Sequence, residues 1–221
     1  MTLPRFPAAV IFDMDGLLFD SERLYAEAVL SAAREVGCAM SHEVFLQLVG
    51  RSREVNHRFL LDHYGADYPL DALIAAWGRH FLALTSGGVP LKPGAAELLD
   101  LLDELGLPRA IATSSTHATV QRNLASLGLA DRFHGVVAHG DYASGKPSPD
   151  PFLKAADRLG VAPGLCLALE DSHNGVRSAS SAGMMAVMVP DLIAPTEEIR
   201  GLCTLVVDDL HAVCRLVGER R

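Results

Sequence analysis

The sequence predicts an α/β protein: a Rossmann-like parallel sheet core with an inserted all-helical cap domain. Two patterns support this fold class. From residue 93 onward, short apolar runs alternate with amphipathic helical segments, as in βαβ units. Residues 20–85, in contrast, contain helical patterns and no convincing strand. We therefore expect a core of residues 1–18 and 90–221 and a cap of residues 19–89.

Composition narrows the class of protein. A formal net charge of -8 argues against a surface for nucleic acid or anionic membranes, and no apolar run is long enough to span a bilayer. The apolar run before Asp13 is too short for a signal peptide, and the cysteines show no C-x-x-C spacing. We expect a cytoplasmic, monomeric protein that binds neither nucleic acid nor membranes.

The first strand is predicted at Ala8–Phe12, an apolar run typical of a strand buried on both faces. It stops at Asp13 and Asp15, followed by Gly16, which lets the backbone turn and approach a ligand closely. Packing does not explain the two carboxylates, because burying unpaired charge is expensive. They suit a divalent cation, a nucleophile with its acid, or both, and the alternative is an aspartate-rich turn.

The predicted cap consists of helical segments joined to the core by two linkers. Helices are expected at Ser21–Gly37, Ser41–Val49, Ser52–Tyr64 and Asp71–Thr85. The linkers Leu18–Ser21 and Ser86–Lys92 are expected to act as a hinge, because Gly87 and Gly88 have wide conformational freedom. Alternatively, these glycines only end the preceding helix.

The core alternates strands and helices after Pro93. Strands are expected at Arg109–Thr113, Gly135–Ala138, Leu165–Leu169, Met185–Val189 and Thr204–Val207. Helices are expected at Ala95–Leu105, Thr116–Leu127, Asp150–Leu159 and Ser172–Ala182, with one more at the C-terminus. Strands separated by helices in this way run parallel, so their carboxyl ends lie on one edge of the sheet.

Polar residues collect where these strands stop. They are Asp13 and Asp15, then Thr113, Ser114 and Ser115, then Lys146 in the loop after the third strand, then Glu170 and Asp171. Carboxylates, hydroxyls, N–H groups and a lysine on one edge suit Mg²⁺ and a phosphoryl group. Singly, Thr113–Ser114 also suits a helix N-cap, Lys146 a solvated loop, and Glu170–Asp171 a cap for the helix that follows. Their joint placement favours the functional interpretation.

The same residues match the motifs of a known family. Asp13–Gly16 matches D-x-D-G, and Thr113 matches the hydroxyl residue that ends the second strand. Lys146 lies in Gly-Lys-Pro-Ser-Pro-Asp, and Glu170–Asp171 lies in Leu-Glu-Asp-Ser-His-Asn-Gly. Over essentially its whole length the chain resembles the haloacid dehalogenase superfamily, in the branch of β-phosphoglucomutase and pseudouridine-5′-phosphatase.

This resemblance implies a Mg²⁺-dependent phosphatase that hydrolyses a small phosphorylated metabolite, of the sugar phosphate or nucleoside monophosphate type, through an aspartyl-phosphate. It implies that Asp13 is the nucleophile and Asp15 the general acid and base. Thr113, the Ser114 backbone and Lys146 would bind the phosphoryl group. The implied metal ligands are Asp13, the backbone carbonyl of Asp15, Asp171 and, directly or from a second layer, Glu170.

The resemblance extends to substrate-binding residues. Gly50, Arg51 and Arg53 lie in a segment that matches the family's specificity loop in the cap, and Ser115 lies at the phosphate edge. The two arginines suit a second anionic or hydroxyl-rich part of the substrate. For Arg51 the alternative is a surface ion pair with a nearby glutamate.

Other members of the superfamily catalyse other reactions. A β-phosphoglucomutase-like phosphomutase is the alternative function. Mutases carry a histidine where this chain has Tyr25 and a cap lysine near Arg79 or His80, and both departures favour a phosphatase. Dehalogenases need no second aspartate, and phosphonate-cleaving members use a cap lysine that this sequence lacks. A catalytically silent phosphometabolite-binding protein is expected to have lost a catalytic carboxylate, and none is missing here.

Overall fold

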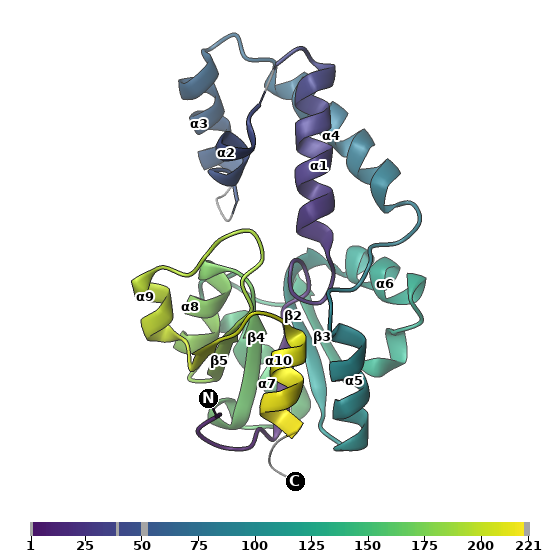
Figure 1. Ribbon diagram of the computed structural model, residues 1–221, viewed down its shortest axis with the longest axis vertical. Helices are drawn as coiled ribbons and strands as arrows, with labels where there is room; N and C mark the ends of the chain where they lie inside the picture. The colour runs from purple at the N-terminus through teal and green to yellow at the C-terminus, as the bar shows by residue number, and fades with distance from the viewer. Residues whose placement is uncertain (1, 39, 50–52, 219–221) are drawn as a thin grey trace. The chain divides into compact units, whose positions relative to one another are not determined.

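The computed structural model describes residues 2–38, 40–49 and 53–218. The chain separates into two compact units, Met1–Asp20 with Val89–Arg221, and Ser21–Gly88. We call the larger unit the core and the smaller unit the cap (Figure 1). The first boundary between core and cap lies after Asp20, two residues later than predicted from the sequence. The second lies before Val89, one residue earlier than predicted.

The core contains a six-stranded parallel sheet in the order β3-β2-β1-β4-β5-β6. The strands are β1 (Ala9–Phe12), β2 (Arg109–Thr116), β3 (Gly135–His139), β4 (Cys166–Glu170), β5 (Met185–Met188) and β6 (Leu205–Val206). The predicted α/β fold class, with a Rossmann-like parallel sheet, is therefore confirmed. All strands stop at the same edge, which is where the polar residues of the sequence collect.

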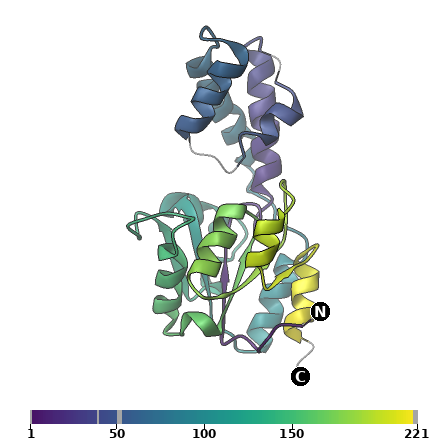
Figure 2. The same ribbon diagram turned by 90° about the vertical axis from the view of Figure 1, so that its left-hand side faces the viewer.

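Helices cover both faces of this sheet. They are α5 (Ala95–Glu104), α6 (His117–Ser126), α7 (Asp150–Leu159), α8 (His173–Ser181), α9 (Glu197–Leu202) and α10 (Leu210–Gly218), with short 3₁₀ turns at Ala130–Arg132 and Pro163–Leu165. Helices α7 and α8 pack on one face, and α5 packs with α10 on the other (Figures 1 and 2). None of the described helices combines the length and apolar character of a bilayer span.

Strand β1 lies at the centre of the sheet and positions the first carboxylate. Val10, Ile11 and Phe12 are fully buried, and burial of each such side chain contributes about 1.5–3 kcal/mol. Phe12 pairs with Leu169 of β4 on one side and with β2 on the other. The N–H of Asp13 then donates to the carbonyl of Leu169 at 2.9 Å, so Asp13 lies between the ends of β2 and β4.

Strand β2 differs from the prediction that it ends at Thr113. It continues to Thr116, and its pairing with β3 shifts register on the way. Ala112 pairs with Val137 and Thr116 pairs with His139, so β2 takes four residues to cover the length that β3 covers with two. The prediction of the strand end was wrong because such a bulge depends on the neighbouring strand, which a local polar pattern does not report.

The described residues of the cap form helices α1 (Ser21–Glu35), α2 (His42–Leu46), α3 (Arg53–Tyr64) and α4 (Leu70–Thr85). Helices α1 and α4 pack against each other. Tyr25 of α1 makes ring contacts with Phe45, Trp77 and Phe81, with centroid separations of 6.1, 5.0 and 6.2 Å. Aromatic and apolar packing therefore holds the cap together.

Candidate active site

The loop after β1 is tightly wound and carries both sequence-predicted aspartates. Gly16 has a φ of 86°, a conformation that favours glycine, and its N–H donates to the Phe19 carbonyl at 2.9 Å. The N–H of Phe19 in turn donates to the Met14 carbonyl at 3.0 Å. Asp13 is buried and Asp15 is half-buried. The fixed backbone thus holds two carboxylates at the carboxyl edge of the sheet.

Glu170 is the most enclosed acid of the site, with no exposed surface. One carboxylate oxygen, Oε2, accepts from the N–H groups of Asp171 (3.1 Å) and Ser172 (3.2 Å) and from the Ser172 hydroxyl (3.0 Å). The carboxylate also lies against Gly175 in α8, where a Cβ atom would lie 1.8 Å from it. Only glycine leaves room for Glu170 at this point of the helix.

Lys146 connects the two buried carboxylates. Its Nζ pairs with Asp13 Oδ1 and with Glu170 Oε1, and it lies 5.0 Å from the centroid of the Phe152 ring. Burial raises the pKa of Asp13 well above its usual range, a shift that Lys146 opposes and the charge of Glu170 reinforces. Burial alone lowers the pKa of Lys146, but Asp13 and Glu170 together raise it above its ordinary value. The ammonium therefore stays charged, and its charge offsets that of the two acids.

The bulge of β2 brings the predicted phosphate-binding residues to the same edge. Thr113 is buried, whereas Ser114 is exposed. The N–H of Ser115 donates to Thr113 Oγ1 at 3.0 Å, and the hydroxyl of Ser115 donates to Asp15 Oδ2 at 2.7 Å. Ser115, expected to bind substrate, therefore contacts the carboxylate for which the resemblance implies the role of acid and base.

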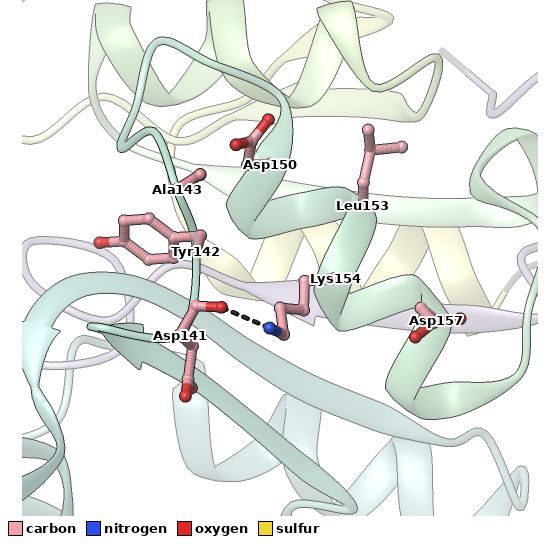
Figure 3. Close-up of a pocket in the computed structure, with 7 residues that line it drawn as sticks. All are labelled: Asp141, Tyr142, Ala143, Asp150, Leu153, Lys154 and Asp157. Atoms are coloured by element: carbon pink, nitrogen blue, oxygen red, sulfur yellow. Dashed lines mark hydrogen bonds between the residues drawn. The ribbon is translucent and has the colours of Figure 1, made fainter.

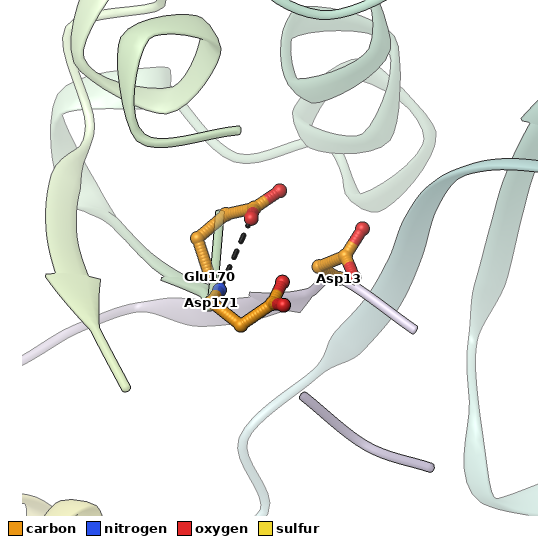
Figure 4. Close-up of side chains that lie close together, drawn as sticks. All are labelled: Asp13, Glu170 and Asp171. Carbon is orange, nitrogen blue, oxygen red and sulfur yellow. Dashed lines mark hydrogen bonds between the residues drawn. The ribbon is translucent and has the colours of Figure 1, made fainter. Parts of the chain in front are cut away.

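Asp13, Glu170 and Asp171 form a group that could hold a metal ion, with ligand oxygens all within 4.8 Å of one another (Figure 4). An all-carboxylate set suits a hard cation such as Mg²⁺. The raised pKa of buried Asp13 points the same way, because bound positive charge offsets the cost of its ionisation. The residues present thus fit the cation that the sequence predicts.

The structure describes the predicted substrate-binding residues of the cap only in part. Gly50 and Arg51 lie outside the residues that the structure describes. Arg53 is the first residue of α3, and its side chain lies outside that description as well. The contacts between the predicted substrate loop and the core edge therefore stay predictions.

The cap positions that distinguish mutases are occupied by side chains that contact other cap residues. Tyr25 lies in the aromatic cluster described above. Arg79 and His80 both pair with Glu35 of α1, with His80 Nε2 at 2.8 Å from a Glu35 oxygen. Arg79 and His80, near which the resemblance places a mutase lysine, therefore join α4 to α1.

Comparisons with known proteins agree with this fold and site. Residues 7–183 match the family model of the haloacid dehalogenase-like hydrolases. A Drosophila melanogaster protein named "Probable pseudouridine-5′-phosphatase" is 40% identical over 187 residues, which are 82% of this chain and 80% of the fly protein. The β-phosphoglucomutase of Bacillus subtilis is 34% identical over 188 residues, 82% of each protein. The chain belongs to the haloacid dehalogenase-like hydrolase family.

A solved structure supports the same assignment. The hydrolase of this family from Deinococcus radiodurans, crystallised with bound phosphate and sodium, superposes with a TM-score of 0.82. It is 26% identical in sequence, and the match covers 96% of this chain and 95% of that chain. The shared fold therefore includes both units of the present chain.

Sequence reasoning missed the residues that support this cluster. The sequence indicates Ser172 only as the start of a helix, yet its N–H and hydroxyl both donate to Glu170. Gly175 carried a usable signal, because a glycine inside a helical pattern often marks close approach of another group. Tyr142, whose hydroxyl donates to the Thr113 carbonyl, has no signal in the sequence pattern around it.

Proposed function

We propose that the protein is a Mg²⁺-dependent phosphatase that hydrolyses a small phosphomonoester through a phosphorylated Asp13. The observation that carries the proposal is the buried ion-pair cluster in which Lys146 lies between Asp13 and Glu170. Burying two acids and a lysine is costly for stability alone, so their retention at a sheet edge favours a chemical role. A phosphatase name and a bound phosphate among the relatives support the reaction class.

The first step transfers the phosphoryl group to the protein. A carboxylate oxygen of Asp13 attacks phosphorus, and the bond from phosphorus to the substrate oxygen breaks. Asp15 donates its proton to the departing oxygen, which leaves as an alcohol. The Ser115 hydroxyl keeps the Asp15 carboxyl group in place through its 2.7 Å hydrogen bond.

The second step returns the protein to its starting state. Asp15, now a carboxylate, takes a proton from a water molecule as the water oxygen attacks phosphorus. The bond from phosphorus to Asp13 breaks, and inorganic phosphate is the product. Asp13 is again a carboxylate and Asp15 again carries a proton, so the cycle balances.

Charge on the phosphoryl oxygens is offset by groups at the same edge. Thr113 Oγ1 already accepts a hydrogen bond and keeps its O–H to donate. Lys146 uses two donors on Asp13 and Glu170, which leaves a third for a phosphoryl oxygen. The Ser114 N–H is a further donor, and such preorganised donors supply much of the catalysis of phosphoryl transfer.

Asp13, Asp171 and the backbone carbonyl of Asp15 would hold Mg²⁺. Glu170 acts from a second layer, because its oxygens already accept hydrogen bonds from Lys146, Ser172 and the backbone. When bound, the cation supplies positive charge opposite the phosphoryl oxygens.

The cap is proposed to close over the core edge, with Gly50, Arg51 and Arg53 contacting the rest of the substrate. Within the core the two linkers are already paired, since the Asp20 N–H donates to the Pro90 carbonyl at 2.8 Å and the Lys92 N–H to the Leu18 carbonyl at 3.0 Å. These pairings confine the proposed hinge to the residues beyond Asp20 and before Pro90. The substrate class is a sugar phosphate or a nucleoside monophosphate.

The direct test is phosphate release from an aryl phosphate. Purified protein with Mg²⁺ is expected to release inorganic phosphate, exhaustive EDTA treatment to abolish the release, and added Mg²⁺ to restore it. Asp13→Asn is the matched control, because it keeps the size of the side chain and removes the nucleophile. Full activity after EDTA treatment, or in Asp13→Asn, contradicts the proposal.

The phosphomutase alternative is favoured by the relative from Bacillus subtilis and tested separately. Because Tyr25 stands in place of the mutase histidine, we expect water to be the main phosphoryl acceptor. The protein is incubated with β-glucose 1-phosphate and a trace of glucose 1,6-bisphosphate. Inorganic phosphate is expected to form faster than glucose 6-phosphate, and the opposite order identifies a mutase.

A further inference from the structure

The bulge in β2 interrupts its regular pairing with β3. Thr113, Ser114 and Ser115 lie between the last regular pair, Ala112 with Val137, and the next pair at Thr116. Backbone groups in a bulge are removed from the regular ladder, so other contacts must set their direction. Direction matters here because the Ser114 N–H is proposed to bind the phosphoryl group.

Two side-chain contacts hold the peptide groups on either side of Ser114. On the C-terminal side, the N–H of Ser115 donates to Thr113 Oγ1 at 3.0 Å. On the N-terminal side, the hydroxyl of Tyr142 donates to the backbone carbonyl of Thr113 at 3.1 Å. Tyr142 belongs to the loop between β3 and α7, the same loop that carries Lys146.

The second contact acts on the phosphate-binding donor itself. The Thr113 carbonyl and the Ser114 N–H belong to one planar trans peptide, so they point in opposite directions. Fixing the carbonyl on the Tyr142 side therefore fixes the N–H on the other side. We propose that Tyr142 is a positioning residue whose hydroxyl orients the Ser114 N–H toward the phosphoryl group of the substrate. This role rests on the proposed phosphatase function.

Tyr142 is suited to this role because its own backbone is held firmly. The neighbouring Asp141 carboxylate accepts from the Ala138 N–H at 3.0 Å and pairs with His117 and Arg158 at 3.0 and 3.1 Å. The Asp141 carbonyl accepts from Lys154 on α7 (Figure 3). The tyrosine thus extends from a segment tied to β3, α6 and α7.

A surface pocket of about 380 Å³ also opens beside this loop, between Asp141, Asp150 and Lys154 (Figure 3). Two of its acidic residues, Asp141 and Asp150, have partners: Asp150 accepts from the Ser144 N–H and the Ser148 hydroxyl. These hydrogen bonds and the contacts of Asp141 hold the loop in place on this side of the pocket. Asp141 and Asp150 therefore support the loop that carries Tyr142 and Lys146.

Tyr142→Phe tests the role, because it removes the hydroxyl and keeps the ring. Tyr68→Phe is the matched control: the Tyr68 hydroxyl is buried in the cap and has no hydrogen-bond partner among the residues described. For each variant, kcat and KM for an aryl phosphate and the inhibition constant for inorganic phosphate are measured with Mg²⁺. The inhibition constant does not depend on the folded fraction of the sample, so it separates positioning from stability.

We expect Tyr142→Phe to raise the inhibition constant for inorganic phosphate and KM about fivefold each, as for loss of one hydrogen bond, and to lower kcat. Tyr68→Phe is expected to leave all three at the wild-type values. An unchanged inhibition constant in Tyr142→Phe overturns the role, including when specific activity falls, because that pattern means a structural effect only.

A second readout separates this role from the reaction itself. If wild-type protein binds inorganic phosphate but does not hydrolyse esters, the proposed function fails while the positioning role is still tested by the Ser114 amide resonance. Phosphate is then expected to shift that resonance in the wild type and to require a higher concentration in Tyr142→Phe. Equal titrations of the two proteins, or no phosphate binding by the wild type, overturn the role.

Discussion

The carboxyl edge of the core and the interior of the cap satisfy their polar groups differently. At the core edge, Glu170 accepts four hydrogen bonds and Lys146 contacts two carboxylates. In the cap, the Tyr68 hydroxyl and the Trp77 Nε1 are buried without a partner among the residues described. A buried network of paired charges holds its side chains in one geometry, whereas a core of aromatic and apolar side chains tolerates substitution by others of similar volume. The difference supports the proposal that the chemistry takes place at the core edge.

Lys146→Met is expected to produce the largest effect on the core side of this comparison. It leaves Asp13 and Glu170 buried without their cation, which costs about 3–5 kcal/mol of unfolding free energy. Loss of the proposed phosphate-binding donor is also expected to lower kcat/KM at least about 100-fold. Urea unfolding and steady-state kinetics measure the two effects.

Lys154→Met is the matched control for that variant. Lys154 is exposed on α7, and its Nζ donates to the backbone carbonyl of Asp141. Its substitution removes one of several contacts that hold the Asp141 segment, so it is expected to change stability by no more than about 0.5 kcal/mol and to lower kcat/KM far less than Lys146→Met does. Similar losses in both lysine variants contradict a special role for Lys146.

Gly175→Ala and Gly78→Ala compare the two regions with one chemical change. At Gly175 the new Cβ lies 1.8 Å from the Glu170 carboxylate, so we expect a loss of about 1–3 kcal/mol and lower kcat. At Gly78, in α4 of the cap, nothing lies within 4 Å, so alanine is expected to stabilise by about 0.5–1 kcal/mol. Thermal unfolding reports both signs. Equal effects of the two substitutions contradict the comparison.

The parts of the fold with strong local patterns could be predicted from the sequence. Strand β1 is an apolar run that ends at Phe12, just before Asp13, and α7 begins and ends where its pattern predicts, at Asp150 and Leu159. Polar residues after each strand identified the residues that the structure brings to one edge. This works because parallel strands bring their carboxyl ends together whatever lies between them.

Features that depend on contacts distant in sequence could not be predicted in this way. The extension of β2 to Thr116 depends on its register with β3, and the contact of Tyr142 with Thr113 depends on that bulge. Helix α9 was also missed, because its six residues are too few for a periodic pattern. Its Thr196 N-cap, which accepts from the Ile199 N–H at 3.3 Å, was the available signal.

Phosphorylation of Asp13 tests the central claim most directly. Wild-type protein is mixed with Mg²⁺ and an aryl phosphate, quenched in acid within the first turnover, digested and analysed by mass spectrometry. The account predicts one phosphoryl group on the peptide that contains Asp13, and none in Asp13→Asn treated identically. Turnover with no phosphorylated peptide, or with the phosphoryl group on another residue, contradicts the account.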